Sequence, residues 1–298
     1  MMPRVRFGKT CLDVAQIGLG GYAFGNVNRA QGWDPYSAAG YAQAIDTVKA
    51  ALDAGINFID TSPGYGGGQS ELVIGEAIEA RRDKVVLATK VPHNGSPDDL
   101  RASVDQSRRR LRTDVIDVLQ IHGRMFIRSD IDHIVNDGIL DAMLDLRAKG
   151  IARFIGFTTE ESWCGRPLIA THAFDMVQLC YNIIYQSAAR HALNEARRED
   201  MGVAVMRPLT SGVFQHIAGL IAPEWQQASD LNEVALKFVL SDSRVHLAIV
   251  GMRWPHEVEK NVHLAENFVP RCDIANVPRT MSQVYRTEDD TAAGPLED

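Results

Sequence analysis

The 298-residue sequence predicts a single (β/α)8 barrel, also called a TIM barrel, preceded by a short β-hairpin. Short apolar segments alternate eight times with longer stretches in which apolar residues recur with helical spacing. Polar residues with reactive side chains stand at the ends of successive apolar segments, and no linker interrupts residues 1–268. Alternating strands and helices of this kind form one parallel barrel, and a chain with 45% hydrophobic residues can fill its core.

The individual elements follow from apolar patterning and from turn residues. The predicted hairpin pairs residues 4–7 with residues 12–14 around a turn at Gly8 and Lys9. The predicted barrel strands are residues 16–19, 57–61, 85–91, 116–122, 153–158, 176–181, 203–207 and 247–250. The predicted helices include residues 41–54, 70–81, 97–111, 139–149, 188–201 and 232–240. Gly55, Gly150 and Gly202 each follow a helix where a left-handed residue ends the last turn.

Composition and charge exclude several classes of function. The net charge of −7 comes without a basic stripe, so nucleic-acid binding is not expected. No apolar run approaches the ~18 residues of a membrane span, and the N-terminus lacks the apolar core of a signal peptide. A soluble cytoplasmic protein is therefore expected. The four cysteines are widely spaced and no histidines have metal-ligand spacing, so neither a disulfide framework nor a metal site is predicted.

The chemistry is predicted to centre on residues 57–71, NFIDTSPGYGGGQSE. Here a buried strand stops at Ser62-Pro63-Gly64, Tyr65 lies on the turn, and three glycines precede a helix whose start is predicted to be capped by Ser70. Asp60 and Tyr65 would thus lie at the carboxyl end of a strand, where parallel barrels carry their active sites.

The next two strands add a lysine and a histidine at the same end of the barrel. Lys90 follows Asp60 by 30 residues and His122 follows Lys90 by 32, about one repeat each. A lysine within a strand as apolar as residues 85–91 is costly to bury without an opposite charge, and Asp60 is the expected partner. Taken singly, Lys90 reads as a lysine reaching solvent from a strand end and His122 as a hydrogen-bonded core histidine. Their coincidence at successive strand ends favours a site.

These four side chains suit proton exchange. A phenol with a pKa near ~10 is a poor acid, but a neighbouring ammonium lowers that pKa, so Lys90 is expected to assist Tyr65. Asp60 would hold Lys90, and His122 would orient a substrate carbonyl. Because no side chain can provide a hydride, a nicotinamide cofactor is implied.

The quartet of Asp60, Tyr65, Lys90 and His122, within FIDTSPGYG, LATKV and DVLQIHG, resembles the catalytic tetrad of the aldo-keto reductases. That family consists of NADP(H)-dependent barrel oxidoreductases that interconvert carbonyls and alcohols. The resemblance extends over roughly residues 4–268 and includes residues 138–158, the strand with Gln178, and IVGMRWPHEVEKN at residues 249–261.

The resemblance also implies the cofactor-binding residues. Gly251 and Met252 would offer backbone groups, Arg253 would pair with the 2′-phosphate, and Glu257 and Asn261 would contact adenine. Gln178 matches the glutamine that binds the nicotinamide amide. The segment RPLTSG lies where the family wraps a loop around the pyrophosphate, which assigns Arg207, Pro208, Leu209, Ser211 and Gly212 to the cofactor.

The loop after the first barrel strand is also assigned to cofactor and substrate, through Gly20, Gly21 and Tyr22. The glycines of GLGGYA also fit a loose dinucleotide fingerprint, but residues 24–36 read as a loop rather than the helix that a Rossmann site requires.

Two positions depart from the family pattern. Thr158 and Thr159 replace a Ser-Asn pair that holds the carboxamide in many members. Met206 and Arg207 stand where many members stack an aromatic ring on the nicotinamide. Methionine can cover a ring face by soft contact, and Arg207 could reach the pyrophosphate.

The function expected from the resemblance is hydride transfer between NADP(H) and a small carbonyl or alcohol, with Tyr65 as proton donor or acceptor. GLGGYAFGN and the glycine-rich turn also suggest an aldose 1-dehydrogenase of the L-fucose or D-arabinose type, and Arg253 lacks the companion lysine of some NADP-preferring members, so NAD stays open. A third hypothesis is a cofactor-sensing regulatory subunit like the β-subunits of potassium channels, which would bind NADP(H) with negligible turnover.

Several questions stay open in the sequence. Trp163, Trp225, Met125 and Phe126 either line a substrate pocket or pack. Residues 269–298, rich in proline and acidic at the end, are predicted to form an extended or mobile tail that is solvated or closes over substrate. The substrate, the preferred direction and the oligomeric state are not determined.

Overall fold

Eight parallel strands close into a barrel in the computed structural model, which describes residues 2–277 apart from the side chain of Gln226. In order around the barrel the strands are β3 (Ile17–Gly20), β4 (Phe58–Asp60), β5 (Val86–Val91), β6 (Ile116–Ile121), β7 (Ala152–Thr159), β8 (Met176–Cys180), β9 (Gly202–Met206) and β10 (Leu247–Gly251). β10 pairs with β3 and closes the ring. The predicted barrel is confirmed, and every predicted strand is present to within one residue at each end.

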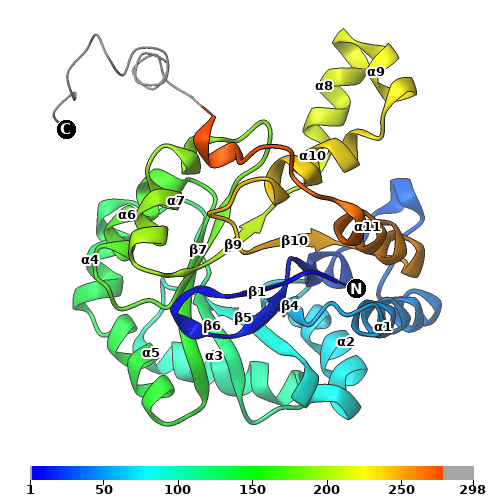
Figure 1. Cartoon of the computed structure of the whole chain (residues 1–298). Coiled ribbons are helices and arrows are strands. Elements are labelled where there is room, and N and C mark those ends of the chain that lie inside the picture. The colour runs from blue at the N-terminus through cyan, green and yellow to red at the C-terminus, as the bar shows by residue number, and fades with distance from the viewer. Residues whose placement is uncertain (1, 278–298) are drawn as a thin grey trace, which may run out of the picture.

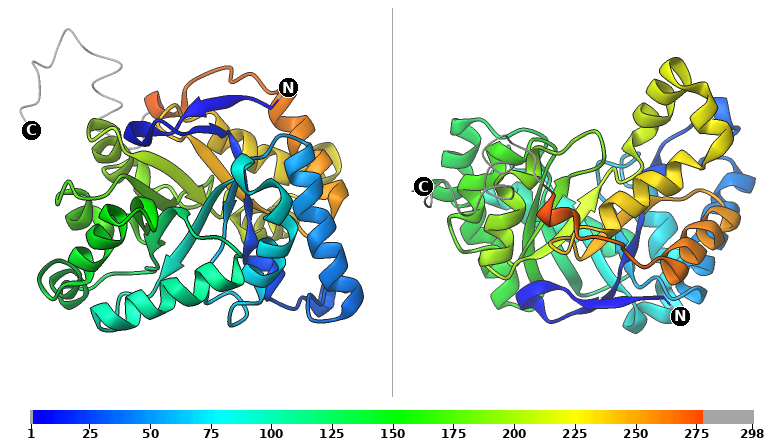
Figure 2. Two further views of the ribbon diagram at one scale, coloured as in Figure 1. Left: turned by 90° about the horizontal axis from the view of Figure 1, so that it is seen from below. Right: turned by 45° about the horizontal axis from the view of Figure 1, so that its top comes forward.

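Helices cover the outside of the barrel on all sides (Figures 1 and 2). The predicted ones are present as α1 (Ala38–Asp53), α2 (Gln69–Ile78), α3 (Pro97–Arg110), α5 (Ile139–Ala148), α7 (Ala192–Arg198) and α10 (Leu231–Leu240). The structure also contains helices that the prediction did not name, namely α4 (Arg128–Asn136), α6 (Ser162–Ile169), α8 (Val213–Ile221), α9 (Pro223–Ala228) and α11 (Pro255–Asn267). α8 and α9, yellow in Figure 1, project from the barrel. α1 begins three residues earlier than predicted because the Ser37 hydroxyl accepts a hydrogen bond from Gly40 N.

The predicted hairpin is confirmed and closes one end of the barrel. β1 (Arg4–Arg6) pairs antiparallel with β2 (Asp13–Ala15), and the hairpin crosses the face of the barrel that is turned to the viewer in Figure 1. Phe7 is fully buried in a cluster with the first residues of several strands, and its ring centroid lies 5.6 Å from that of Phe58. Because the amino ends of the strands are plugged in this way, only the carboxyl ends are available for a site.

The barrel interior has an apolar layer and a polar layer. Val118, Met176 and Leu247 belong to the apolar cluster above the hairpin. The next inward-facing level holds buried polar side chains, namely those of Asp60, Lys90, Gln120, Thr158 and Gln178. The register brings them to one level, because Lys90 lies opposite Gln120 and Thr158 lies opposite Gln178 on neighbouring strands.

Two local predictions are wrong. Gly202 does not end a helix but begins β9, where a Cβ would approach the Phe7 ring to 2.7 Å, and Asp200 takes the left-handed conformation instead. Ser70 does not cap α2, since Gly68 holds that position with φ +99°. The Ser70 hydroxyl instead bonds Thr61 Oγ1 and donates to the Gly21 carbonyl, both at 2.8 Å. Gly55 and Gly150 do have left-handed φ, as predicted.

The last described residues lie at the plugged end of the barrel. Ile274 N donates to the Ser241 carbonyl at 2.8 Å, and Asp273 accepts from Ser243 N at 3.0 Å, in the turn that precedes β10. Residues 278–298 lie outside the described residues, so an extended tail that is solvated or closes over substrate stays a prediction.

Truncating Phe7, the hairpin residue that closes the amino end of the barrel, tests how much the hairpin contributes to stability. Phe7→Ala is expected to lower the free energy of unfolding by about 3–5 kcal/mol, because a fully buried aromatic ring leaves a cavity between hairpin and strands. Urea denaturation followed by circular dichroism measures the change. A loss below about 1 kcal/mol would mean that the hairpin is not part of the barrel's core.

Candidate active site

Lys90 and Asp60 form a buried ion pair in the polar layer. Asp60 is the last residue of β4, Lys90 lies near the end of β5, and their exposed fractions are 2% and 1%. Lys90 Nζ lies 2.6 Å from Asp60 Oδ2 and also donates to the Thr61 carbonyl at 2.8 Å. The ammonium therefore meets an opposite charge and a carbonyl, which offset the cost of removing it from water.

Tyr65 meets the same ammonium from the loop between β4 and α2. Its hydroxyl lies 3.1 Å from Lys90 Nζ, which also stands 4.9 Å from the ring centroid. The loop turns through three successive glycines with left-handed φ, Gly66 to Gly68. Gly25 packs against it so closely that a Cβ there would lie 2.2 Å from the Tyr65 carbonyl oxygen. Backbone packing thus fixes the phenol over the ion pair.

Tyr65 and Lys90 both keep their protons at neutral pH, since the pKa of each is raised. Burial raises the pKa of Tyr65 and outweighs the Lys90 ammonium, which lowers it. The sequence-based expectation of a lowered pKa is therefore wrong, because the site excludes more water than the strand pattern indicates. Burial lowers the pKa of Lys90, but Asp60 and Tyr65 together raise it by more, so the net shift is upward.

His122 follows β6 and lies beside Tyr65, with the two ring centroids 5.9 Å apart. Its Nδ1 is 3.1 Å from the Ser62 hydroxyl, which itself accepts from Gly64 N. The hydroxyl hydrogen is then free to donate to Nδ1, which puts the imidazole proton on Nε2. Burial, followed by the Lys90 charge, lowers the pKa of His122 to about 4. At neutral pH this residue is a neutral hydrogen-bond donor.

Two glutamines complete the polar layer, and the sequence analysis assigned a role to only one. Gln178 Nε2 lies 3.4 Å from Asp60 Oδ2, and its Oε1 is buried without a partner among the described residues. Gln120, which the sequence analysis missed, donates through Nε2 to Asp60 Oδ1 at 3.0 Å. The available signal was strand alternation, since Gln120 precedes His122 by two residues and so faces the same side.

The loop after β9, which the sequence analysis assigned to the pyrophosphate, has an unusual backbone conformation. Arg207, Thr210 and Ser211 are not glycines, yet they have φ between +54° and +59°, and Gly212 follows with φ +86°. Backbone held in this conformation is costly and collects at functional sites. Thr210 N and Gly212 N donate to the carbonyls of Arg207 and Leu209 within the loop. Arg207 Nη2 pairs with Glu160 Oε1 at 2.8 Å, so its guanidinium is engaged between the loops after β9 and β7. Met206, at the end of β9, is half-buried.

The segment after β10 leads into α11. Met252 is fully buried, Gly251 is exposed, and Arg253 N donates to Glu257 Oε2 at 2.6 Å in the first turn of the helix. Asn261 Nδ2 donates to the Glu257 carbonyl at 2.7 Å. Arg253 Nε is buried and lacks a partner among the described residues. An unsatisfied arginine donor at a helix start fits the phosphate of a dinucleotide, and the free Gln178 oxygen fits an amide.

The other residues predicted to contact the cofactor differ in burial and in bonding. Thr158 Oγ1 both donates to the Gly123 carbonyl and accepts from Gly123 N, each at 3.0 Å, so its hydroxyl is engaged within the chain. Tyr22 is 61% exposed and packs edge-on against Tyr65 at 5.3 Å. A Cβ on Gly21 would lie 2.7 Å from the Ser70 hydroxyl, so only glycine fits there. Among the described residues no cluster of His, Cys, Asp or Glu could hold a metal ion.

Phe126 packs in the core, next to Phe157 and His93, which decides one of the open alternatives. Met125, Trp163 and Trp225 are half or more exposed, so they stay candidates for ligand contacts. No helix within residues 2–277 has the length and apolar character needed to traverse a lipid bilayer.

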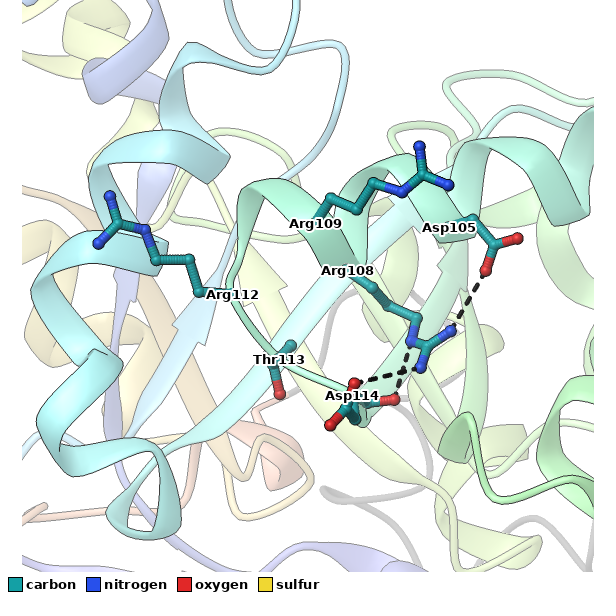
Figure 3. A pocket seen from close by; sticks show the side chains of 6 residues that line it. All are labelled: Asp105, Arg108, Arg109, Arg112, Thr113 and Asp114. Atoms are coloured by element: carbon teal, nitrogen blue, oxygen red, sulfur yellow. Dashed lines mark hydrogen bonds and ion pairs between the residues drawn. The ribbon is translucent and has the colours of Figure 1, made fainter.

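Two surface hollows lie away from these residues. One of about 470 Å³ is lined by Asp105, Arg108, Arg109, Arg112, Thr113 and Asp114. Figure 3 shows Arg108 there, bonded to Asp105 and Asp114. The other hollow, of about 500 Å³, lies between α6 and α7. Neither includes a residue of the polar layer, so the barrel mouth remains the candidate site.

Comparisons with known proteins identify the family of the chain. The model of the Aldo/keto reductase family matches residues 16–220, more than half of the chain. The chain is 29% identical over 292 residues to the L-galactose dehydrogenase of Arabidopsis thaliana, covering 86% of this chain and 85% of that protein.

Solved structures give the same fold. An aldo-keto reductase from Bacillus halodurans in its holo form superposes with a TM-score of 0.76 at 22% identity, covering 91% of this chain and 92% of that one. An aldo/keto reductase from Klebsiella pneumoniae in complex with NADP and acetate has a TM-score of 0.72 at 25% identity, and the shares covered are 96% and 95%.

The protonation of His122 can be measured directly. Its imidazole signals, assigned with His122→Gln, should titrate in NMR with a midpoint near pH 4. Because the unfolded chain takes up this proton at higher pH than the folded one, acidification from pH 6.5 to 4 should also destabilise the protein. A midpoint at or above pH 6 would show that the ring is solvated and not held neutral.

Proposed function

Because the chain belongs to the aldo/keto reductase family, we propose that it is an NADP(H)-dependent oxidoreductase that interconverts a small carbonyl compound and its alcohol, with Tyr65 exchanging the proton. The observation that carries the proposal is the buried chain of contacts from Asp60 through Lys90 to the Tyr65 hydroxyl, with His122 beside it. All four side chains lie at the open end of the barrel.

Each residue has a part that its surroundings support. A bound nicotinamide would supply or accept the hydride. Tyr65 gives its proton to the substrate oxygen in reduction, and the Lys90 ammonium at 3.1 Å stabilises the phenolate that remains. Asp60 keeps Lys90 charged and in place. Neutral His122 donates a hydrogen bond to the substrate oxygen and orients it.

The raised pKa of Tyr65 determines how each direction of the reaction depends on pH. A raised pKa leaves the proton on Tyr65, which is the form that donates. Oxidation of an alcohol needs the deprotonated phenol as a base, so its rate should rise with pH through the Tyr65 pKa.

The cofactor assignment draws on unsatisfied atoms and on relatives. Gln178 Oε1 suits the nicotinamide amide, the loop at residues 207–212 suits the pyrophosphate, and Arg253 suits the 2′-phosphate. The Klebsiella pneumoniae structure, 25% identical, is a complex with NADP, which supports the same cofactor here. NAD remains an alternative, because Glu257 adds a negative charge beside Arg253.

An aldose dehydrogenase is the second candidate. The L-galactose dehydrogenase of Arabidopsis thaliana matches 86% of this chain, and a sugar is a small carbonyl or hemiacetal that the same four residues could serve. A regulatory cofactor sensor stays the third, and absence of turnover with bound NADP(H) is what would favour it.

A cofactor-absorbance screen tests the proposed reaction. Purified protein with NADPH, NADH and their oxidised forms is assayed against aromatic aldehydes, short ketones and free aldoses. We expect turnover with at least one class, and Tyr65→Phe should lower kcat by about 10²–10⁴-fold, because the proton donor is removed. Full activity in Tyr65→Phe would overturn the role of Tyr65.

Cofactor discrimination is tested by fluorescence titration with NADPH and NADH. Arg253→Ala should weaken NADPH binding by about 10–100-fold, the loss of a charge-assisted contact, and change NADH binding by less than about 3-fold. Arg109→Ala, an exposed arginine at the other end of the barrel, is the matched control. An equal loss for both dinucleotides would argue against a 2′-phosphate contact.

A further inference from the structure

We propose that Gln120 is a positioning residue of the active site, whose amide holds the Asp60 carboxylate in the orientation that keeps Lys90 against Tyr65. This inference rests on the proposed function, since it assigns Gln120 a part in the same proton exchange. Neither the family resemblance nor the chemistry of the four proposed catalytic residues includes it.

The location of Gln120 is the first argument. It lies in β6, is fully buried, and pairs in register with Lys90 on β5. The inward-facing residue before it on β6, Val118, belongs to the apolar layer. An amide at this depth is costly to bury unless it is hydrogen-bonded, and its bond goes to Asp60.

The geometry around Asp60 is the second argument. Lys90 Nζ contacts Oδ2 at 2.6 Å and Gln178 Nε2 lies 3.4 Å from the same oxygen, whereas Gln120 Nε2 contacts Oδ1 at 3.0 Å. Among the described residues, Gln120 is the one hydrogen-bond donor to Asp60 Oδ1. The amide must present its NH₂ group here, because its oxygen would repel the carboxylate. With both oxygens held, the carboxylate cannot rotate away from Lys90.

Gln120 also differs from Gln178 in its contacts and in the role proposed for it. Gln178 is the residue proposed to meet the nicotinamide amide, and its contact with Asp60 is the longer one. Gln120 contacts the other Asp60 oxygen, so its bond shares no atom with that of Gln178. The Oε1 atom of Gln120 is buried and has no partner among the described residues, which is unfavourable for an acceptor. The hydrogen bond from Nε2 to Asp60 Oδ1 is therefore the contact that accounts for an amide at this position.

Loss of this hydrogen bond would act on Tyr65 through Lys90. A carboxylate without a donor on Oδ1 can rotate, the Lys90 ammonium moves with Oδ2, and its contact with the Tyr65 hydroxyl is weakened. The phenolate is less stabilised, so its pKa rises and proton exchange slows.

The test compares three variants. Gln120→Met removes the donor at similar volume. Gln120→Glu replaces it with a group that donates only when protonated. Leu119→Met, a volume-conserving change on the outward face of β6, is the control. Steady-state kinetics are measured against pH with the substrate found in the screen. Tyrosinate absorbance is followed against pH without substrate, with Tyr65→Phe identifying the contribution of Tyr65.

We expect Gln120→Met to lower kcat by about tenfold or more while each KM changes by less than about 3-fold, the result of losing one bond to a charged group. The Tyr65 titration should move to higher pH. In Gln120→Glu, burial and Asp60 raise the pKa of the new carboxyl, so activity should approach that of the original protein at low pH and fall as the carboxyl ionises. Leu119→Met should behave like the original protein.

An unshifted Tyr65 titration together with unchanged kcat in Gln120→Met would overturn the proposal. So would a loss of the same size in Leu119→Met, which would indicate general damage to β6. If Gln120→Met does not fold, the pH dependence of Gln120→Glu decides, and a pH-independent loss counts against positioning. Absence of any turnover in the original protein would refute the proposed function instead, and the tyrosinate titration would still test Gln120.

Discussion

The buried pair of Lys90 and Asp60 is the interaction on which the rest of the site depends. An unpaired ammonium at this depth would be unstable by several kcal/mol, so the barrel must supply a carboxylate within contact distance. The position of the ammonium fixes where it can stabilise a phenolate, and the loop after β4 places the Tyr65 hydroxyl there. Burial keeps His122 neutral, and the Lys90 ammonium adds to this effect because it disfavours a second positive charge nearby.

The barrel accommodates this buried ion pair because its interior is separated into an apolar layer and a polar layer. The hairpin closes the amino end through Phe7, and the apolar layer above it excludes water from below. The polar layer can then open only toward the carboxyl ends of the strands, where Gln120 and Gln178 satisfy Asp60. Stability and chemistry are divided along the barrel axis, which is why one fold can keep its core while its loops vary.

The sequence predicted the strands well because their pattern is simple and strong. Each is a short apolar run, buried on both faces, ending in turn residues. The helices were harder: α4, α6, α8 and α9 were not named, since short helices rely on tertiary contacts more than on periodicity. The longer α11 was not named either. Ser70 was assigned to a cap, yet its hydroxyl bonds Thr61 and Gly21, which are distant enough in sequence that no local rule pairs them.

The sequence by itself determined the barrel, its hairpin and the alignment of Asp60, Lys90 and His122, because strand spacing and alternation are local properties that repeat. The tertiary structure decided what depends on burial and on contacts across the barrel. It gave the upward shift of the Tyr65 pKa, the neutrality of His122, and the engagement of Thr158 by Gly123. It also revealed Gln120, whose partner lies 60 residues away and becomes its neighbour only when the strands close into a ring.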